Sequence, residues 1–280
     1  MTGVFGYPVH HSQSPAMHNA AFQELGLDIV YVPFNVHPDS LRAAVQGIRA
    51  LDLLGVNVTI PHKEQVIQFL DWVSEDAQRI RSVNTIHNSA GILKGYSTDG
   101  LGFVKALEAA GKSPKGSKAA VLGAGGSARA TVHALVTHGA DVTVVNRTYS
   151  RAVELSELLN AALGEKGVVK PIALDSSDAQ KSVLEADLLV NCTSVGMHPH
   201  TDVQPIPSEW LHQGLFVYDQ IYNPLETKLL KAAKAAGART VNGVKMLVLQ
   251  GVLSFEIWTG QQPPVKVMED TVLAGLETRS

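Results

Sequence analysis

Lys63 is a residue whose type and position are suited to proton transfer. It lies in the stretch NVTIPHKEQV (57–66), which is typical of a strand that ends at Pro61 and continues into a helix. The partial positive charge at the start of a helix disfavours the ammonium form of a lysine, so such an amine could exchange a proton near neutral pH. For a lone lysine at a helix start, however, a solvated surface charge is the commoner interpretation.

A glycine-rich turn in AAVLGAGGSARATVHAL (119–135) indicates a dinucleotide site. Gly123, Gly125 and Ala128 have the G-x-G-x-x-A spacing, after a predicted strand and before a predicted helix. The first glycine permits the tight turn, the second lets the backbone approach a pyrophosphate, and the alanine lets the helix pack close to the strand. The helix start offers N–H groups to phosphates. Such turns also serve packing alone, but the strand–turn–helix–strand context favours dinucleotide binding.

The end of the next strand indicates which dinucleotide would bind. NAD-binding units carry an acidic residue roughly 20 residues after the glycines, where it bonds the ribose 2′-hydroxyl. The stretch DVTVVNRT (141–148) instead ends in Asn146, Arg147 and Thr148. An arginine can bond a phosphate in two places, so these residues favour NADP. The alternative is that Arg147 is an ordinary surface residue.

Further polar clusters lie just past predicted strand ends or on tight loops, where open α/β sheets bind ligands. Their small hydroxyl and amide groups could bond a polyol or a carboxylate. Any one of Ser12, Ser14 and Thr59 could instead merely cap a helix. The clusters are HSQSP (11–15), NVTIPHK (57–63), SVNTI (82–86) and YSTDG (96–100).

Composition narrows the class of protein. Of 280 residues, 45% are hydrophobic and 18% are charged, as in ordinary globular proteins. The net charge of -3 gives no basic face for nucleic acid. The single cysteine, Cys192, cannot form an intrachain disulfide, which suits a reducing cytoplasm. Neither a signal peptide nor a membrane-spanning stretch is evident, so we expect no membrane partner.

Strands alternate with helices along the chain, which predicts parallel βαβ units in two α/β domains. A hairpin is predicted over 82–99, and a segment rich in glycine, serine and lysine (111–118) marks the boundary between the domains. A second strand–helix series then runs to ARTVNG (238–243). The predicted helices outside this series are Ala16–Leu25, Ser40–Leu51, His62–Trp72, Leu101–Ala110, Lys245–Trp258 and Val265–Leu276.

Taken together, these motifs make the chain resemble the shikimate dehydrogenase family. The likeness covers nearly the whole sequence in order: HSQSP, NVTIPHKE, SVNTI, STDG, GAGGSARA, NRTYSRA, TSVGM, DQIYNPLE and NGVKMLVLQG. The resemblance implies reversible reduction of 3-dehydroshikimate to shikimate with NADPH, in aromatic amino-acid biosynthesis. It also implies a substrate-binding domain (1–110, completed by helices in 244–280), a Rossmann NADP-binding domain (111–243) and a catalytic cleft between them.

The resemblance assigns a role to individual residues. Lys63 and Asp99 become the catalytic pair: the amine gives a proton to the ketone oxygen and takes it back in reverse, and Asp99 holds it. The implied substrate-binding residues are Ser12, Ser14, Thr59, Asn84, Asp99, Tyr222 and Gln250. The implied cofactor-binding residues are Glu75, Gly123, Ala124, Gly125, Gly126, Ser127, Asn146, Arg147, Thr148, Arg151, Gln220 and Gly243.

Two positions depart from the family pattern. Gln220, beside the expected nicotinamide site, stands where methionine is frequent, and Ser97 stands where asparagine is frequent. Glu75 is assigned only from its distance along the chain to Asn84.

Three alternative functions differ from this one in the residues that they would require. A quinate/shikimate dehydrogenase of the same family would differ in a few substrate contacts and often in cofactor. A methylene-tetrahydrofolate dehydrogenase shares the two-domain plan but not the substrate motifs, and a non-catalytic NADP-binding regulator would not need Lys63 and Asp99. The histidine pairs His10–His11 and His198–His200 lack metal-ligand spacing, so no metal is expected. The expected assembly is a monomer or homodimer.

Overall fold

The computed structural model describes residues 1–164 and 169–278 and divides the chain into two compact units. Unit 1 contains residues 1–102 together with the chain from Leu247 onward, and unit 2 contains Phe103–Met246. The boundaries fall inside α4 (Asp99–Ala109) and α9 (Val244–Thr259). Both units are α/β, which confirms the predicted fold class. Residues 165–168 of the predicted second strand–helix series and the last two residues of the segment 244–280 lie outside the described residues.

Unit 1 is built on a six-stranded mixed sheet within the described residues, in the order β2-β1-β3-β5-β6-β4. The first three strands pair in parallel, and β5 and β6 form the predicted antiparallel hairpin. Its strands are β1 (Thr2–Gly6), β2 (Tyr31–Asn35), β3 (Gly55–Val58), β4 (Trp72–Val73), β5 (Thr85–Ser89) and β6 (Ile92–Tyr96). Its other elements are α1 (Ser14–Glu24), η1 (Pro38–Ser40), α2 (Leu41–Ala50), η2 (Gln65–Phe69), α3 (Glu75–Ile80) and α10 (Val265–Glu277).

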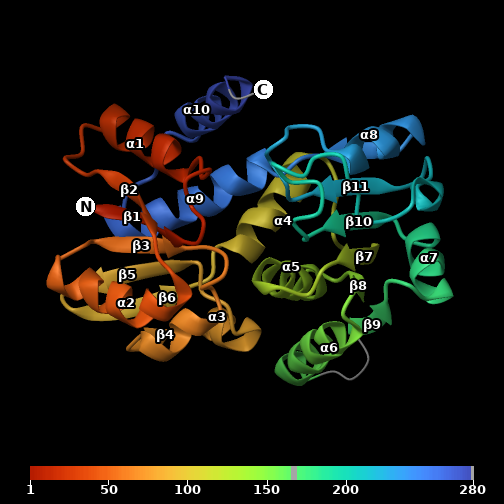
Figure 1. The fold of residues 1–280 in the computed structure, drawn as a ribbon, viewed down its shortest axis with the longest axis horizontal. Coiled ribbons are helices and arrows are strands. Elements are labelled where there is room, and N and C mark those ends of the chain that lie inside the picture. The colour runs from red at the N-terminus through yellow and green to blue at the C-terminus, as the bar shows by residue number, and fades with distance from the viewer. Residues whose placement is uncertain (165–168, 279–280) are drawn as a thin grey trace. The chain divides into compact units, whose positions relative to one another are not determined.

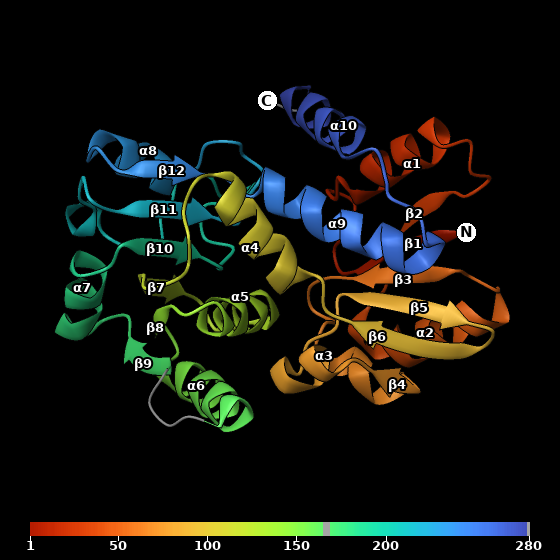
Figure 2. The same ribbon diagram turned by 180° about the vertical axis from the view of Figure 1, so that it is seen from behind.

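The C-terminal helices complete unit 1. Helix α10 packs against α1, and both ribbon views show the two helices side by side (Figures 1 and 2). On α9, the indole Nε1 of Trp258 donates a hydrogen bond to the Ile86 carbonyl on β5 (2.9 Å). Gly55 on β3 lies under this bond, because a β-carbon there would overlap both the indole nitrogen and the carbonyl oxygen. The last helices are therefore tied to a sheet formed by the first hundred residues.

Unit 2 contains a six-stranded sheet, all parallel among the described residues, in the order β12-β11-β10-β7-β8-β9. Helices α7 and α8 contribute to a continuous apolar core with β7, β10 and β11. Its strands are β7 (Lys118–Leu122), β8 (Asp141–Asn146), β9 (Val169–Ala173), β10 (Leu188–Asn191), β11 (Phe216–Asp219) and β12 (Arg239–Val241). The other elements are α5 (Gly126–Thr137), α6 (Tyr149–Leu163), α7 (Ser177–Leu184), η3 (Ser208–Trp210) and α8 (Lys228–Ala235).

Asp219, the last residue of β11, is a buried carboxylate that organises the loops at this edge of the sheet. Its Oδ1 accepts hydrogen bonds from Asn191 Nδ2 (3.0 Å) and Ile221 N (3.1 Å), and its Oδ2 accepts from Thr227 Oγ1 (2.6 Å). Thr227 in turn caps α8. Burial raises the pKa of Asp219 to about 6, against the effect of these hydrogen bonds.

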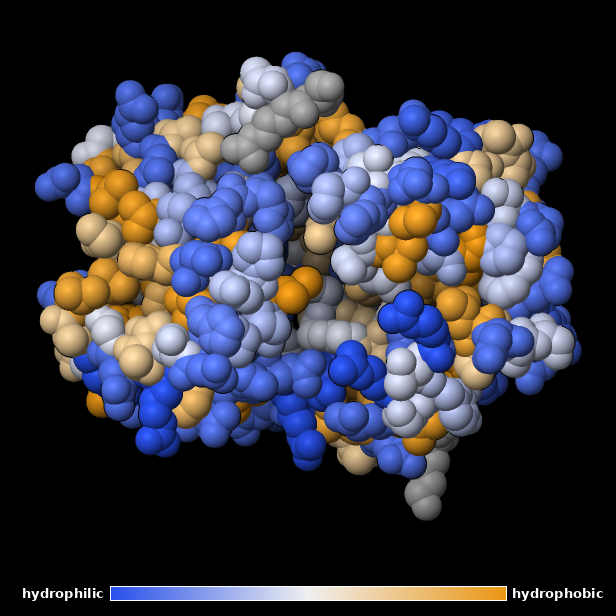
Figure 3. Space-filling model, in the orientation of Figure 1, coloured by the Kyte–Doolittle hydropathy of each residue, from blue (hydrophilic) through white to orange (hydrophobic). Residues whose placement is uncertain are grey.

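The surface is polar with separate apolar patches. On the face shown in Figure 3, hydrophilic residues surround small groups of hydrophobic ones, which do not form a continuous band. No helix in residues 1–164 and 169–278 combines the length and apolar character needed to cross a bilayer.

We expect Gly55→Ala to destabilise unit 1 by at least about 3 kcal/mol, because the added methyl must displace the Trp258–Ile86 hydrogen bond and overpack a buried contact. Gly47→Ala is the matched control: it lies in α2 with open space around a β-carbon, and should stabilise by about 0.5–1 kcal/mol. Denaturant unfolding of both variants measures this. Equal stability of Gly55→Ala and the wild type would contradict the packing described.

A second prediction concerns the pH dependence of stability. Because the folded-state pKa of Asp219 lies above its ordinary value of 3.8, the folded protein binds more protons between about pH 4 and 6. Its contribution to stability is therefore lost as pH rises through that window. Asp219→Asn removes this titration, so the Tm of the variant minus that of the wild type should increase between pH 4.5 and pH 7.5.

The exposed Asp141→Asn, at the start of β8, serves as the control and should show no such change. A constant Tm difference for Asp219→Asn across this pH range would show that the buried carboxyl does not titrate as described.

Candidate active site

Lys63 and Asp99 form an ion pair in unit 1. The Lys63 Nζ lies 2.6 Å from Asp99 Oδ2. Their side chains are only 13% and 7% exposed, so little water competes for the contact. A short charge-assisted hydrogen bond of this kind holds the amine in one place. The structure thus brings together the two residues that the sequence predicts for proton transfer.

The backbone around Lys63 differs from the prediction. The helix expected at His62–Trp72 is wrong: Lys63 lies in a turn, followed by the 3₁₀ segment η2 and the short strand β4. The Lys63 carbonyl accepts a hydrogen bond from Val83 N (2.9 Å), so the chain here is turned towards a distant segment. The argument from a helix N-terminus therefore does not apply, and the contact with Asp99 is what orients the amine.

Asn84 holds the other oxygen of Asp99. Its Nδ2 donates to Asp99 Oδ1 and to Thr98 Oγ1, each at 2.8 Å, while its Oδ1 accepts from Thr98 N (2.8 Å). Asn84 precedes β5, and Asp99 follows β6 as the first residue of α4. The hairpin β5–β6 therefore brings the amide and the carboxylate together, and both carboxylate oxygens have a protein donor.

The other predicted substrate residues of unit 1 follow strand ends or lie on α9. Gln13 rather than Ser12 is the N-cap of α1, and no side chain caps that helix; Ser12 Oγ accepts from Ser14 N (3.2 Å). Thr59 directly follows β3, and its N–H donates to the Phe5 carbonyl (2.8 Å). These positions do not support the helix-capping interpretation of Ser12 and Thr59.

Gln250 is brought to the same place from the far end of the chain. Its Nε2 donates to the Leu247 carbonyl (2.7 Å) within α9, and its Oε1 lies 3.3 Å from Asn84 Nδ2. Asn84, Asp99 and Gln250 therefore form one cluster of polar side chains in unit 1.

In unit 2, the glycine turn has the form that a pyrophosphate requires. Gly123 has φ +107°, a conformation that favours glycine, and Gly125 is the N-cap of α5. A β-carbon at Gly125 would meet nothing within 4 Å, and no side chain caps the helix. Ala124, Gly126 and Ser127 complete the turn, and Ala128 is fully buried against the sheet. The space beside Gly125, at the N-terminus of this twelve-residue helix, is therefore open, which fits a dinucleotide phosphate.

The residues predicted to bind the 2′-phosphate lie at the end of β8 and the start of α6. Asn146 Nδ2 donates to the Thr148 carbonyl (2.9 Å), and Thr148 is the N-cap of α6 without using its side chain. Arg147 and Arg151 are exposed. Within the described part of the chain, neither guanidinium pairs with a carboxylate. Two uncompensated positive charges beside a helix N-terminus suit a doubly charged phosphate.

The remaining predicted residues of unit 2 follow β11, for Gln220 and Tyr222, and β12, for Gly243. Gly243 N donates to the Ile221 carbonyl (3.0 Å), and a β-carbon at Gly243 would overlap the Gln220 carbonyl. Only glycine therefore fits at 243. The Gln220 side chain donates from Nε2 to Thr131 Oγ1 on α5 (2.7 Å), and Tyr222 is half-buried nearby in sequence.

Glu75 is an exposed residue of unit 1. It occupies the first turn of α3, its side chain is 78% exposed, and its carboxylate pairs with Arg79 one turn later. A contact between Glu75 and the cofactor stays a prediction.

Several buried polar residues around the Lys63–Asp99 pair were assigned no role from the sequence alone. Asn57 (6% exposed) stands in the otherwise apolar strand GVNV, and Ser254 (0%) lies on α9 among apolar residues. A polar side chain in a buried apolar stretch must find hydrogen-bond partners, and that was the available signal. Thr98 was within a quoted motif but was not assigned a role.

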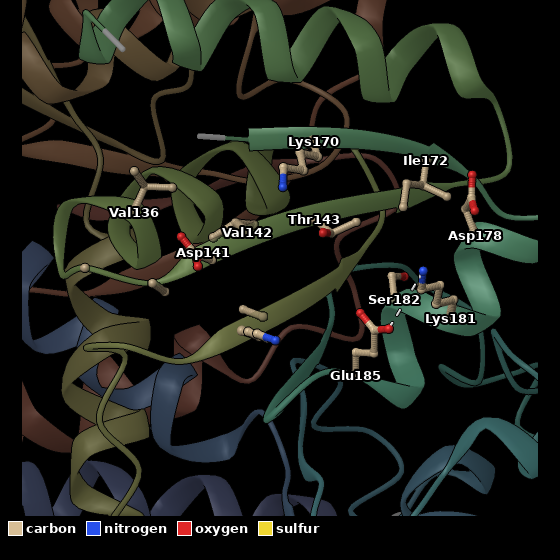
Figure 4. A pocket seen from close by; sticks show the side chains of 14 residues that line it. Val136, Asp141, Val142, Thr143, Lys170, Ile172, Asp178, Lys181, Ser182 and Glu185 are labelled. Atoms are coloured by element: carbon tan, nitrogen blue, oxygen red, sulfur yellow. Dashed lines mark ion pairs between the residues drawn. The ribbon is translucent and has the colours of Figure 1, made fainter. Parts of the chain in front are cut away.

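A cavity of about 730 Å³ lies in unit 2, and none of the predicted site residues lines it. It adjoins the amino ends of β7 and β8, where Lys118 and Asp141 begin the strands, whereas the glycine turn follows the carboxyl end of β7. Figure 4 shows Lys181 on α7 paired with Glu185, the residue directly after this helix (4.0 Å). Its charges are mixed, and it offers no arrangement for chemistry. Within residues 1–164 and 169–278 no three His, Cys, Asp or Glu side chains gather as metal ligands.

Comparison with known proteins extends the likeness beyond the motifs. Three family models match: the shikimate dehydrogenase substrate binding domain at residues 4–86, shikimate / quinate 5-dehydrogenase at 105–201, and the shikimate 5'-dehydrogenase C-terminal domain at 243–273. A curated shikimate dehydrogenase (NADP(+)) from Methanopyrus kandleri is 48% identical over 279 residues, covering 99% of this chain and 96% of that protein.

Solved structures show the same likeness to shikimate dehydrogenases. A crystal structure of a shikimate dehydrogenase in complex with NADP+ matches with a TM-score of 0.92 and 42% identity, covering 98% of this chain and 95% of the other. The enzyme of Thermus thermophilus in complex with NADP(H) and shikimate matches with a TM-score of 0.88 and 39% identity, covering 98% and 99%. The chain therefore belongs to the shikimate dehydrogenase family.

Proposed function

We propose that this protein catalyses the reversible NADPH-linked reduction of 3-dehydroshikimate to shikimate, a step of aromatic amino-acid biosynthesis. The observation that carries the proposal is the buried contact between Lys63 Nζ and Asp99 Oδ2 at 2.6 Å, with Asn84 on the second carboxylate oxygen. The likeness to NADP-dependent shikimate dehydrogenases over almost the full chain supports the substrate and the cofactor.

The proposed chemistry divides between the cofactor and the side chains of unit 1. Bound NADPH supplies the hydride. Negative charge then develops on the ketone oxygen, and the ammonium of Lys63 donates a proton to it. In the reverse direction the neutral amine accepts the proton of the hydroxyl group. Asp99 keeps the amine in place and stabilises its charged form. The reaction requires the nicotinamide and the substrate carbon to be in contact.

Substrate recognition is proposed to rest on hydroxyl and amide groups. A polyhydroxylated ring acid offers several donors and acceptors, and each buried polar group left unpaired would weaken binding. The proposed contacts are Ser12, Ser14, Thr59, Asn84, Asp99, Tyr222 and Gln250. Residues 1–110 with 244–280 would form the substrate-binding domain, and residues 111–243 the NADP-binding domain.

The cofactor preference is proposed to come from the start of α6. The guanidinium groups of Arg147 and Arg151, which pair with no carboxylate in the described residues, would bind the 2′-phosphate together with Asn146 and Thr148. The glycine turn would hold the pyrophosphate, and Gln220 and Gly243 would flank the nicotinamide. The direct test of the whole proposal is the absorbance of NADPH or NADH formed from NADP or NAD, with shikimate and with quinate as substrates.

Lys63→Ala should lose about 10²- to 10⁴-fold in kcat while binding shikimate at near wild-type affinity, because the variant lacks the proton donor but keeps the hydroxyl and amide contacts. Steady-state kinetics and a titration of shikimate binding separate the two quantities. The exposed Lys105→Ala on α4 is the control and should match the wild type. Near-normal turnover of Lys63→Ala would end the catalytic assignment.

Arg147→Ala should raise the apparent KM for NADP by about 10- to 150-fold and leave that for NAD almost unchanged, because a charge-assisted bond to the 2′-phosphate is lost. Adding Asn146→Asp should shift preference further towards NAD through repulsion of the phosphate. The exposed Lys231→Ala on α8 removes the same charge elsewhere in unit 2 and is the control. An equal loss with both cofactors would mean that Arg147 only supports the fold.

A further inference from the structure

A buried hydroxyl cluster lies behind the polar side chains of the proposed active site. Ser254 Oγ on α9 lies 2.8 Å from Thr85 Oγ1 and 3.4 Å from Thr98 Oγ1, and it accepts a hydrogen bond from Asn57 Nδ2 (3.0 Å). Its single proton can be donated to Thr85 Oγ1 or to the Gln250 carbonyl one turn earlier (3.1 Å). Ser254 and Thr85 are fully buried, so these groups depend on protein atoms rather than on solvent for their hydrogen bonds.

The cluster contacts the Asn84 amide at both ends. Thr98 Oγ1 accepts from Asn84 Nδ2 (2.8 Å), and Thr85 Oγ1 donates to Asn84 Oδ1 (3.2 Å). The Thr98 backbone N–H, which can only donate, gives its hydrogen to Asn84 Oδ1 (2.8 Å) and so sets which end of the amide is the oxygen. The two hydroxyl groups bond to the amide in that orientation and hold it in place. This orientation directs the amide hydrogen towards Asp99 Oδ1. The reversed amide would place its oxygen against the carboxylate, and the two would repel each other.

Tyr31 fixes the other side of the cluster. Burial raises the pKa of Tyr31, so the phenol keeps its proton and donates it to Asn57 Oδ1 (2.8 Å). With its oxygen engaged in this way, Asn57 directs its Nδ2 to Ser254 and Thr85. The Tyr31 ring is stacked on His18 (4.6 Å between centroids), whose pKa burial lowers to about 3, so no charge disturbs this packing.

We propose that Ser254 is a positioning residue: its hydroxyl, acting through Thr85 and Thr98, holds the Asn84 amide in place and thereby the Asp99 carboxylate. The inference rests on the proposed function, in which Asp99 holds the proton-transferring amine. Ser254 does not contact the substrate. It joins α9 to the residues at the ends of β5 and β6, so that Gln250 and Asp99 are held by one network.

Removal of the Ser254 hydroxyl leaves Thr85, Thr98 and Asn57 with fewer partners in a site that water does not reach. The Asn84 amide keeps its bonds to Thr98 N and Asp99 but is packed against less firmly held hydroxyls, so Asp99 is positioned less precisely. Because displacement of a catalytic group by about 1 Å can cost roughly 100-fold in rate, Ser254→Ala should lower kcat by about 10- to 100-fold. The KM for NADPH should stay within about twofold of the wild type, since Ser254 contacts none of the proposed cofactor-binding residues in the described structure.

The experiment compares kcat and KM of the full-length protein with 3-dehydroshikimate and NADPH in four variants. Ser254→Ala and Thr85→Val remove a hydroxyl from the cluster and should both be slow. Thr85→Ser keeps that hydroxyl and should restore most of the rate. Thr271→Ala on α10 removes a hydroxyl that makes the same bond to the preceding turn (2.7 Å to the Val267 carbonyl), and it should equal the wild type.

Three results would overturn the inference. One is a wild-type kcat in Ser254→Ala. Another is a Thr85→Ser variant as slow as Thr85→Val, which would implicate size rather than hydrogen bonding. The third is a rise in the KM for NADPH that matches the loss of kcat, which would indicate general loosening. A wild-type protein without dehydrogenase activity would instead refute the proposed function.

A measurement that needs no turnover distinguishes a failure of the positioning role from a failure of the proposed function. The side-chain amide signals of Asn84 in a nitrogen–proton correlation spectrum report on its orientation whatever the reaction is. They should shift or broaden in Ser254→Ala and stay unchanged in Thr271→Ala. Identical Asn84 signals in Ser254→Ala and the wild type would contradict the positioning role directly.

Discussion

The attachment of α9 to the sheet of unit 1 is the constraint on which the first unit depends. Trp258 donates to the Ile86 carbonyl and Ser254 bonds to a group of hydroxyls beside it, while Gly55 leaves the space that the indole requires. The bonded residues are separated by more than half of the chain, and the residues of unit 2 lie between them in the sequence. Closing so long a loop costs conformational entropy, which the buried contacts of α9 and α10 must offset. Without this attachment Gln250 would have no fixed relation to Asn84.

The same attachment completes the polar cluster around Lys63 and Asp99, because α9 supplies Gln250 and Ser254. A lysine and an aspartate in water would gain little from their contact, since solvent screens exposed pairs. Here both side chains are almost completely buried, and the carboxylate accepts from Lys63 and Asn84. Such a pair is costly to desolvate unless its remaining polar groups are hydrogen-bonded. The Asn84 amide meets this requirement for Asp99, and the buried hydroxyls of Thr85, Thr98 and Ser254 hold that amide in place. The same hydrogen bonds therefore stabilise the ion pair and fix its geometry.

In the proposed function, unit 2 binds the negative charge of the cofactor. It would do so with the N-terminus of α5 and a pair of exposed arginines rather than with a buried network. Exposed charges cost little when no ligand is present and can exchange water for phosphate oxygens. The buried carboxylate at this edge, Asp219, has three uncharged donors and serves the loops instead. Burial without a counter-charge explains why its pKa lies above the ordinary range.

The amino-acid sequence was sufficient for the order and type of most elements, because glycine turns, β-branched strands and apolar spacing are local signals. The glycine motif, the absent acid after β8 and the chain-long series of motifs were likewise local, and they led to the right family. The helix expected after Pro61 was wrong, because the backbone there bonds to Val83 rather than to its own next turn.

The partners of Ser254, Asn57 and Asp219 could not be found in the sequence, since each pairing joins residues from separate strands or helices. Hydrogen-bond partners of a buried polar group depend on which elements are neighbours in space. That is fixed by the packing of the whole unit and not by the spacing of residues along the chain.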